Sequence, residues 1–477
     1  MNKPIFRVYL VVVVLFALLV AWTSRWTVFE AEALRDNAKN RRELLDQQRI
    51  DRGPIRDRDG NLIARSVAGP QDTYSRRYPE DPLFPHAVGY SFVDAGEAGL
   101  ERFYTDALVG DHGEITTLLD QFLARKREGD ELRTTLDPGA QRAAIDALGG
   151  RKGAVVVMEP DTGKVRVMTS VPGYDQNAIR NQETFDALLE DEANSPLLNR
   201  ATQALYPPGS TFKVVTAAAA LDSGEFTPET TIDGNSGKEI SGVPLANSGG
   251  QDFGPITLTT ALTNSVNTVW AEVAEDLGKG TMARYMERFG FGVDPPIDLP
   301  ADEKAPSGEY VEGRVVPATS GAVDVGRMAI GQDKLLVTPL QMATVAATVA
   351  NDGKRMKPWL MDRIVDPDGR TREDAEPEQE ARVMSESAAR ELQQMMGNVV
   401  REGTGTAAAL QGIEVGGKTG TAEIDPDTDL NQPWFVGFAP LDDPQYAIAV
   451  TVERSQGGQG GTVAAPVAQR VLQELLG

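Results

Sequence analysis

The sequence predicts an α+β protein with an apolar N-terminal helix, a small mixed module, and a larger domain in which helices flank a central antiparallel sheet. Residues 8–24 carry no charge, which is long enough for one membrane-spanning helix. Runs rich in β-branched residues occur near residue 153 and again at 414–454, with alanine-rich helical segments between them. A sheet that pairs such distant segments around intervening helices is typical of an α+β domain.

The apolar run has a clear charge asymmetry. Lys3 and Arg7 precede it, and Glu30 and Glu32 follow it. The positive-inside rule therefore places the short N-terminus in the cytoplasm and exports the rest of the chain. A cleaved signal peptide is the alternative, but no small-x-small cleavage site follows the run. We expect 1–28 to be a cytoplasmic stub and an uncleaved anchor in a single-pass protein of the cell membrane.

Composition excludes several kinds of site. The formal net charge of −23 argues against nucleic acid as a partner, because phosphate binding requires clustered Lys and Arg. The absence of cysteine excludes disulfides, thiolate nucleophiles and thiolate zinc sites. The two histidines, His86 and His112, both lie far upstream of Ser210, on the other side of the predicted domain boundary. A Ser-His-Asp triad or a zinc site with several histidines is therefore not expected.

Residues 29–150 are expected to form the small module. It begins with a polar, helix-prone segment at 30–53, which reads as a stalk or a connecting helix. Asp59-Gly60 between two extended runs predicts a β-hairpin. The composition changes at Gly153, so we place the domain boundary near residue 150 and assign 151–477 to the larger domain. The charged segment 366–382 is predicted to be a hairpin or a loop without chemistry.

The larger domain is predicted element by element from its hydrophobic pattern. A hairpin through "EPDTG" joins two strands within 153–171, and a helix runs from Ser210 to a stop at Gly224. The segment 257–278 is helical with a break near Ser265, and 338–353 is a buried helix. Three strands follow within 414–423, 433–440 and 445–454, and the terminal helix is 465–477.

Ser210 and Lys213 follow a turn formed by Pro207, Pro208 and Gly209. Three residues apart on a helix, their Cβ atoms lie about 5–6 Å apart on one face, so the amine can reach the hydroxyl. A serine becomes a nucleophile when a base takes its proton, and lysine is the available base here. That lysine must be neutral, which requires burial or a nearby positive charge to lower its pKa. The alternative is a helix-capping serine beside a surface lysine.

Two further motifs each occur once in the chain. Ser265-Val-Asn267 puts a hydroxyl and an amide at the predicted helix break, although a helix cap would use the same residues. Lys418-Thr-Gly-Thr lies in a predicted strand, where Lys418 and Gly420 face one way and Thr419 the other. An edge-strand lysine is the alternative for that motif. Three unique motifs in this order favour a common catalytic site over coincidence.

With S-x-x-K, S-x-N and K-T-G in this order, the chain resembles the penicillin-binding serine acyltransferases. The likeness covers nearly the whole chain and points to the class B penicillin-binding proteins, in particular to their compact actinobacterial type without appended C-terminal repeats. The segments that carry it are "RGPIRDRDGNLIA", "TTLDPGAQRAA", "GAVVVMEPDTGKV", "LNRATQALYPPGSTFK", "TPLQMA" and "WFVGFAP". The resemblance implies a penicillin-binding, serine β-lactamase-like fold for 151–477 and a non-catalytic dimerisation or pedestal module at 29–150.

The resemblance also implies roles for the motif residues. Ser210 would be the acylated nucleophile and Lys213 its general base. Ser265 and Asn267 would relay a proton and hold the substrate amide. Lys418, Thr419, Gly420 and Thr421 would form the substrate-binding strand, with Lys418 and Thr419 on a carboxylate. The backbone N–H groups of Ser210 and Thr421 would form the oxyanion hole, since a helix start favours developing negative charge.

The activity implied is that of a peptidoglycan D,D-transpeptidase, which cross-links stem peptides through a serine acyl-enzyme and is inhibited covalently by β-lactams. No metal or cofactor is expected. The expected partners are a SEDS-type glycan polymerase and divisome proteins, with a role in cell-wall synthesis, cell shape and division. A D,D-carboxypeptidase would share every motif. A β-lactamase is disfavoured because no Glu between Asn267 and Lys418 has Asn four residues later. A non-catalytic β-lactam sensor or division scaffold is disfavoured because so few residues precede the anchor.

Overall fold

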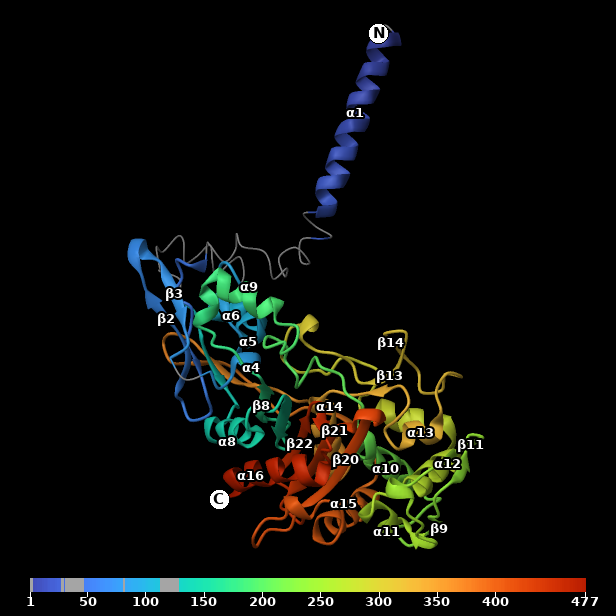
Figure 1. The fold of residues 1–477 in the computed structure, drawn as a ribbon. Helices are drawn as coiled ribbons and strands as arrows, with labels where there is room; N and C mark the ends of the chain where they lie inside the picture. Colours follow the sequence, from blue (N-terminus) through green and yellow to red (C-terminus); the bar gives the residue numbers. More distant parts are fainter. Residues whose placement is uncertain (1–2, 27–29, 31–46, 80–81, 112–127) are drawn as a thin grey trace.

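The computed structural model describes residues 3–26, 30, 47–79, 82–111 and 128–477. Helix α1 (Lys3–Ser24) projects away from the rest of the chain (Figure 1) and buries none of its residues. Its mean hydropathy of 2.6 and its length suit a membrane span, although a signal sequence would have the same properties. Most of the predicted stalk, at 31–46, lies outside the described residues.

The N-terminal module is built on a sheet with the strand order β18-β17-β6-β1-β2-β3. Its strands are β1 (Ile55–Arg56), β2 (Leu62–Ala68), β3 (Tyr74–Arg77), β6 (Glu131–Thr134), β17 (Met361–Val365) and β18 (Thr371–Asp374). The hairpin predicted at Asp59-Gly60 joins β1 to β2, and Gly60 has a φ of 87° there. The charged segment near 366–370 forms the turn between β17 and β18, so a distant part of the chain completes this sheet.

Short elements cover the module beside the sheet. They are α4 (Pro85–Val88), β4 (Ser91–Phe92), β5 (Gly96–Glu97), α5 (Gly99–Phe103) and α6 (Thr105–Leu108). Gly89 and Gly99 allow α4 and α5 to approach closely, because a Cβ on Gly89 would lie 1.8 Å from the Ala98 carbonyl oxygen.

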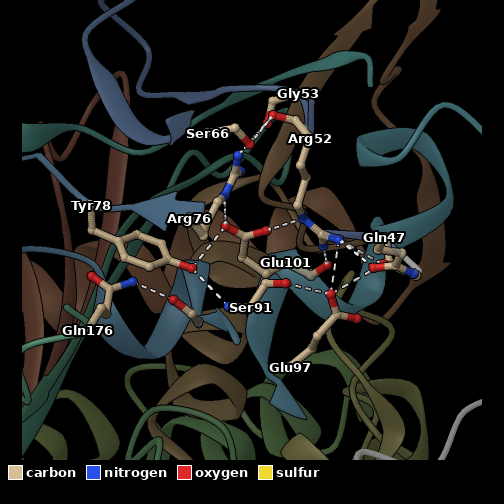
Figure 2. A network of polar contacts seen from close by, with 12 residues as sticks. Gln47, Arg52, Gly53, Ser66, Arg76, Tyr78, Ser91, Glu97, Glu101 and Gln176 are labelled. Atoms are coloured by element: carbon tan, nitrogen blue, oxygen red, sulfur yellow. Dashed lines mark hydrogen bonds and ion pairs between the residues drawn. The ribbon is translucent and has the colours of Figure 1, made fainter. Parts of the chain in front are cut away.

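A buried ionic network joins these elements to the sheet (Figure 2). The Glu101 carboxylate is fully buried and accepts from Arg52 Nε at 2.8 Å, Arg76 Nε at 2.6 Å and the Tyr78 hydroxyl at 3.0 Å. Arg52 also pairs with Glu97 at 2.9 Å. Burial alone would raise the pKa of Glu101, but the two arginines outweigh it and hold that pKa below its ordinary value.

We expect Glu101→Gln to destabilise the N-terminal module by about 3–5 kcal/mol, because two buried arginines lose their shared counter-charge. Asp374→Asn is the control, since Asp374 is 58% exposed and lies 3.7 Å from Arg363, where the change should cost at most about 1 kcal/mol. Urea unfolding of both variants measures the difference. Equal losses would mean that the buried network contributes no more than a surface ion pair.

The larger domain has an antiparallel sheet with the strand order β20-β21-β22-β7-β8. Its strands are β7 (Gly153–Met158), β8 (Val165–Val171), β20 (Gly416–Asp425), β21 (Leu430–Ala439) and β22 (Tyr446–Val452), with β23 (Ser455–Gln456) on β21. The prediction that distant strands pair is confirmed, because β7 lies beside β22. The three C-terminal strands are also confirmed.

Both faces of this sheet are covered by helices (Figure 1). On one face, Val155 and Val157 share a core with α8 (Pro138–Leu148) and α16 (Ala465–Leu476). On the other face, Val156 packs in a core with α10 (Lys213–Ser223), α14 (Pro339–Ala350) and α15 (Glu386–Arg401). Alternate valines of one strand therefore bury against different helices, as the two-residue period of a strand requires. Helix α8 precedes residue 150 in sequence yet packs on this sheet.

Most of the remaining strands and helices lie around the helical side of the domain, whereas α9 (Gln182–Glu190) lies beside the N-terminal module, with Phe185 against Tyr90 (Figure 1). The others are η3 (Ala178–Arg180), β9 (Thr231–Asp233), β10 (Lys238–Ile240), β11 (Val243–Leu245), β12 (Pro255–Thr257), α11 (Leu258–Thr263), α12 (Asn267–Arg288), β13 (Gly308–Val311), β14 (Arg314–Val316), α13 (Val325–Ala329), β15 (Leu335–Leu336), β16 (Lys354–Met356) and β19 (Gln379–Arg382). The predicted helical break near Ser265 is confirmed by the gap between α11 and α12.

Candidate active site

Ser210 lies in a short turn against the edge of the larger sheet. This turn, η4 (Gly209–Phe212), leads into α10, so Ser210 precedes the regular helix that the sequence predicted to begin there. Gly209 has a φ of 52°, and a Cβ on it would lie 3.0 Å from backbone atoms of Thr421. Glycine thus allows β20 to lie directly against the turn that carries the serine.

The Lys213 side chain is fully buried at the start of α10. Its Nζ donates to the Ser265 carbonyl oxygen at 2.7 Å and to Asn267 Oδ1 at 2.7 Å, and it lies 3.3 Å from Ser265 Oγ. The amine therefore contacts the second motif. Within the described part of the chain, the Ser210 hydroxyl makes no hydrogen bond, so none joins it to Lys213 in this arrangement.

The second motif lies in the turn between α11 and α12. Ser265 has a φ of 60°, a left-handed conformation that is uncommon for serine. This conformation brings both the carbonyl and the hydroxyl of Ser265 to Lys213, while Asn267 begins α12 and reaches the same amine. The turn thus places two polar side chains from the predicted helix break at one point.

The third motif supplies a second buried amine. Lys418, fully buried on β20, donates from Nζ to Ser265 Oγ at 2.8 Å. A Cβ on Gly420 would lie 2.7 Å from the Pro208 carbonyl oxygen, so glycine is required for the approach of strand and turn. Thr419 lies elsewhere, with its hydroxyl 2.6 Å from that of Thr404. The alternation predicted for this strand is thus observed.

Thr421 faces a different segment. Its hydroxyl accepts from the Gly460 backbone N–H at 3.1 Å. The structure therefore brings Lys213, Ser265, Asn267 and Lys418 into one hydrogen-bonded group beside the turn of Ser210, whereas the hydroxyls of Thr419 and Thr421 bond to other parts of the chain.

The two amines share one hydroxyl without a carboxylate partner among the described residues. Burial, and then the positive charge of Lys418, hold the pKa of Lys213 well below its ordinary value. Burial lowers the pKa of Lys418 to about 7. The lowered pKa of Lys213 favours its neutral form, which can act as a base, while Lys418, whose pKa lies near neutral pH, carries part of a positive charge that an anionic group would stabilise.

Asn247 and Thr404 contact motif residues but belong to no motif. Thr404 follows α15 and meets Thr419, and Asn247 lies in the loop after β11 and meets the start of α12. Nothing in the local sequence marks either residue, because each contact depends on tertiary packing. In the described ranges, no group of three or more His, Cys, Asp or Glu side chains is arranged to hold a metal ion.

Comparison with known families finds two matches along the chain. The family model described as penicillin binding protein transpeptidase domain matches residues 153–473. The model described as penicillin binding protein A dimerisation domain matches residues 52–132. The first match contains all three motifs, and the second covers most of the N-terminal module.

Individual proteins are similar over the whole chain. The chain is 36% identical to the peptidoglycan D,D-transpeptidase PbpA of Mycolicibacterium smegmatis, an alignment covering 100% of this chain and 99% of that protein. It is 31% identical to penicillin-binding protein A of Mycobacterium tuberculosis in its ceftriaxone acyl-enzyme complex. That match has a TM-score of 0.81 and covers 91% of this chain and 100% of the solved structure. The penicillin G acyl-enzyme complex of the same protein is 31% identical, with a TM-score of 0.80 and coverage of 90% and 100%.

Proposed function

The chain belongs to the penicillin-binding proteins with a transpeptidase domain, and from this premise we propose that it is a peptidoglycan D,D-transpeptidase acting through an acyl-enzyme on Ser210. The observation that supports this most directly is the convergence of the three motifs. Lys213 and Lys418, far apart in sequence, both contact Ser265 beside the turn that carries Ser210. A buried amine with a lowered pKa, three residues after a serine whose hydroxyl makes no hydrogen bond among the described residues, suits the activation of a nucleophile.

In the proposed acylation step, Ser210 Oγ attacks the carbonyl carbon of the penultimate D-alanine of a stem peptide. Its proton passes to the Nζ of neutral Lys213 as substrate binds. Catalytic hydrogen bonds are commonly loose without substrate, so the observed contacts of Lys213 are compatible with this role. The backbone N–H groups of Ser210 and Thr421 would stabilise the oxyanion.

Collapse of the intermediate breaks the C–N bond and releases the terminal D-alanine. Ser265 would return a proton to that leaving amine, since its hydroxyl lies between Lys213 and Lys418. An acceptor amine from a neighbouring stem then attacks the ester, and the Ser210 hydroxyl is restored. Penicillins would acylate the same serine but resist the second step, which accounts for covalent inhibition.

The reaction products test this proposal. The chain is incubated with a pentapeptide donor ending in D-Ala-D-Ala and with an amine acceptor, and the products are separated by mass. A new amide between donor and acceptor with release of D-alanine is expected. Hydrolysed donor without any amide product would instead assign the chain to the D,D-carboxypeptidases.

We propose that α1 is an uncleaved anchor in the cell membrane and that the transpeptidase domain lies outside the cytoplasm. The boundaries 1–28, 29–150 and 151–477 are proposed with it as divisions of the sequence, while in space α8 packs on the larger sheet and β17 and β18 complete the smaller one. The N-terminal module, which matches a dimerisation domain family, would position the catalytic domain and meet a SEDS-type glycan polymerase and divisome proteins.

Lys418 and Thr419 are proposed to bind the substrate carboxylate, and their loss should weaken substrates that carry one. A charge-assisted hydrogen bond contributes about 1.5–3 kcal/mol, so Lys418→Ala should reduce the preference for carboxylate substrates roughly tenfold to a hundredfold. Removing this cation also raises the pKa of Lys213, so acylation should require higher pH. Thr419→Val should reduce the same preference without moving the pH profile, since threonine carries no charge.

The measurement is a pH–rate profile of acylation for both variants, with a β-lactam and with a thioester that lacks the carboxylate. The assigned roles fail if Thr419→Val moves the profile as far as Lys418→Ala does. They also fail if both variants slow the two substrates equally.

A further inference from the structure

The start of helix α12 is capped by a residue from another segment. Its own N-cap is Val266, whose side chain has no acceptor for the free N–H groups of the first turn. Asn247 supplies that acceptor from the loop after β11. Its Oδ1 accepts from the backbone N–H of Asn267 at 3.0 Å and of Thr268 at 3.1 Å. The Thr268 hydroxyl also donates to it, at 3.2 Å.

The amide nitrogen of Asn247 is also hydrogen-bonded. Its Nδ2 donates to the carbonyl oxygens of Gly234 at 2.8 Å and Gln251 at 3.0 Å, and the side chain is nearly fully buried. If the amide were flipped, its NH2 group would face the backbone N–H groups of α12, and its oxygen would face the two carbonyl oxygens. The hydrogen-bond network therefore defines one orientation of the Asn247 side chain. Asparagine suits this position because acceptors and donors are needed at opposite ends of one short side chain.

The loop that contains Asn247 also binds the side-chain amide of Asn267. The Ala246 carbonyl oxygen accepts from Asn267 Nδ2 at 3.1 Å, next to the bond between Asn247 and the Asn267 backbone. Both the main chain and the amide group of Asn267 are therefore fixed from the 246–247 segment. This leaves Asn267 Oδ1 directed at Lys213 Nζ, 2.7 Å away.

The fixed acceptors orient the base. A neutral lysine amine has two N–H bonds and one lone pair. When the N–H bonds point to the Ser265 carbonyl and to Asn267 Oδ1, the direction left for the lone pair is determined. The left-handed φ of Ser265 is strained for serine and persists only where surrounding contacts hold it. Asn247 provides such a contact, because it accepts a hydrogen bond from the backbone of Asn267, two residues after Ser265.

We infer that Asn247 is a positioning residue for the acylation of Ser210: by capping α12 from outside, it holds Asn267 and the Ser265 turn so that the Lys213 amine is correctly directed. This inference rests on the proposed function, because it assigns Asn247 a part in the activation of Ser210. Asn247 itself touches none of the proposed reacting atoms.

The variants Asn247→Ala and Asn247→Asp test this role, with Asn264→Ala as the matched control. Asn264 is an exposed asparagine beside the same turn, and among the described residues its side chain bonds only to the Thr260 carbonyl oxygen, at 3.0 Å. The full chain is reacted with penicillin across pH. The final amount of acyl-enzyme gives the competent fraction, and the rate constant is independent of that fraction, so partial misfolding does not obscure the result.

We expect Asn247→Ala to lower the acylation rate constant roughly tenfold to a hundredfold, the effect of a displacement of about 1 Å in a reacting group. Its pH profile should also move to lower pH. Losing fixed acceptors destabilises the Lys213 ammonium more than the amine, and the remaining charged group facing it is Lys418. Asn247→Asp keeps the acceptor for the helix start, but it replaces the donor to the Gly234 and Gln251 carbonyl oxygens with a negative charge, so its profile should move to higher pH.

Asn264→Ala should have the same acylation rate constant and the same pH profile as the unchanged chain. A rate constant for Asn247→Ala within twofold of the unchanged chain would overturn the inference, as would a slower rate with an unmoved pH profile, which a purely structural role would give. The proposed function is tested separately by the unchanged chain: if penicillin does not acylate it, that function fails, whatever Asn247 does.

Discussion

Ser210→Ala is expected to abolish acylation by penicillin while the fold stays intact. The hydroxyl is the proposed covalent site, and loss of a nucleophile costs roughly 10⁴-fold or more in rate, so labelling should fall below detection. The substitution should be structurally mild. Ser210 Oγ has no hydrogen-bond partner among the described residues, so no polar group is left unpaired, and alanine is well tolerated in helical conformation.

The measurement is intact-protein mass spectrometry after penicillin treatment, beside circular dichroism and thermal unfolding of the same sample. Thr211→Ser in the same turn is the control. It keeps the hydroxyl that donates to the Pro208 carbonyl oxygen at 2.8 Å, so labelling should persist. A folded Ser210→Ala variant that still takes up penicillin would show that the nucleophile is another residue.

Lys213→Arg is expected to lose activity as fully as Lys213→Ala does. General base catalysis contributes about 10²–10⁴-fold, and a guanidinium remains protonated in proteins, so arginine cannot take the serine proton. Arginine does keep donors for the Ser265 carbonyl and Asn267 Oδ1, which alanine leaves unpaired. The pair therefore separates the role of base from that of hydrogen-bond donor.

Acylation rate constants are measured for both variants from acid to alkaline pH. For the unchanged chain, the rate should rise with pH as Lys213 loses its proton, and the rise should occur well below the ordinary pKa of lysine because burial and Lys418 lower it. Neither variant should show this rise. Near-normal acylation by Lys213→Arg would remove Lys213 from the role of base.

Much of the fold could be predicted because its local patterns are strong. The β-branched runs of β7 and β22, the Gly224 that ends α10, and the break at Ser265 all have signatures within a few residues. The motif residues could be identified from their types and order, and the structure shows that Lys213, Ser265, Asn267 and Lys418 meet.

The remainder depends on long-range packing. Pairing of β17 with β6 joins residues more than two hundred positions apart, and no local pattern at 361–365 indicates that partner. The contact of Lys213 with Ser265 in place of Ser210 follows from the left-handed turn, which the sequence around Ser265 does not reveal. Asn247 is undetectable for the same reason, since its function depends on the missing cap at Val266 in another segment.

The central claim, that Ser210 carries the acyl group, is tested most directly by mapping the penicillin adduct on the unchanged chain. Tryptic cleavage after Arg200 and Lys213 yields the peptide 201–213, which contains Ser210, Thr202 and Thr211. Fragmentation of that peptide locates the added mass. We predict that one whole penicillin is attached at Ser210. An adduct on any other residue, or a folded chain that takes up no penicillin, would contradict the account.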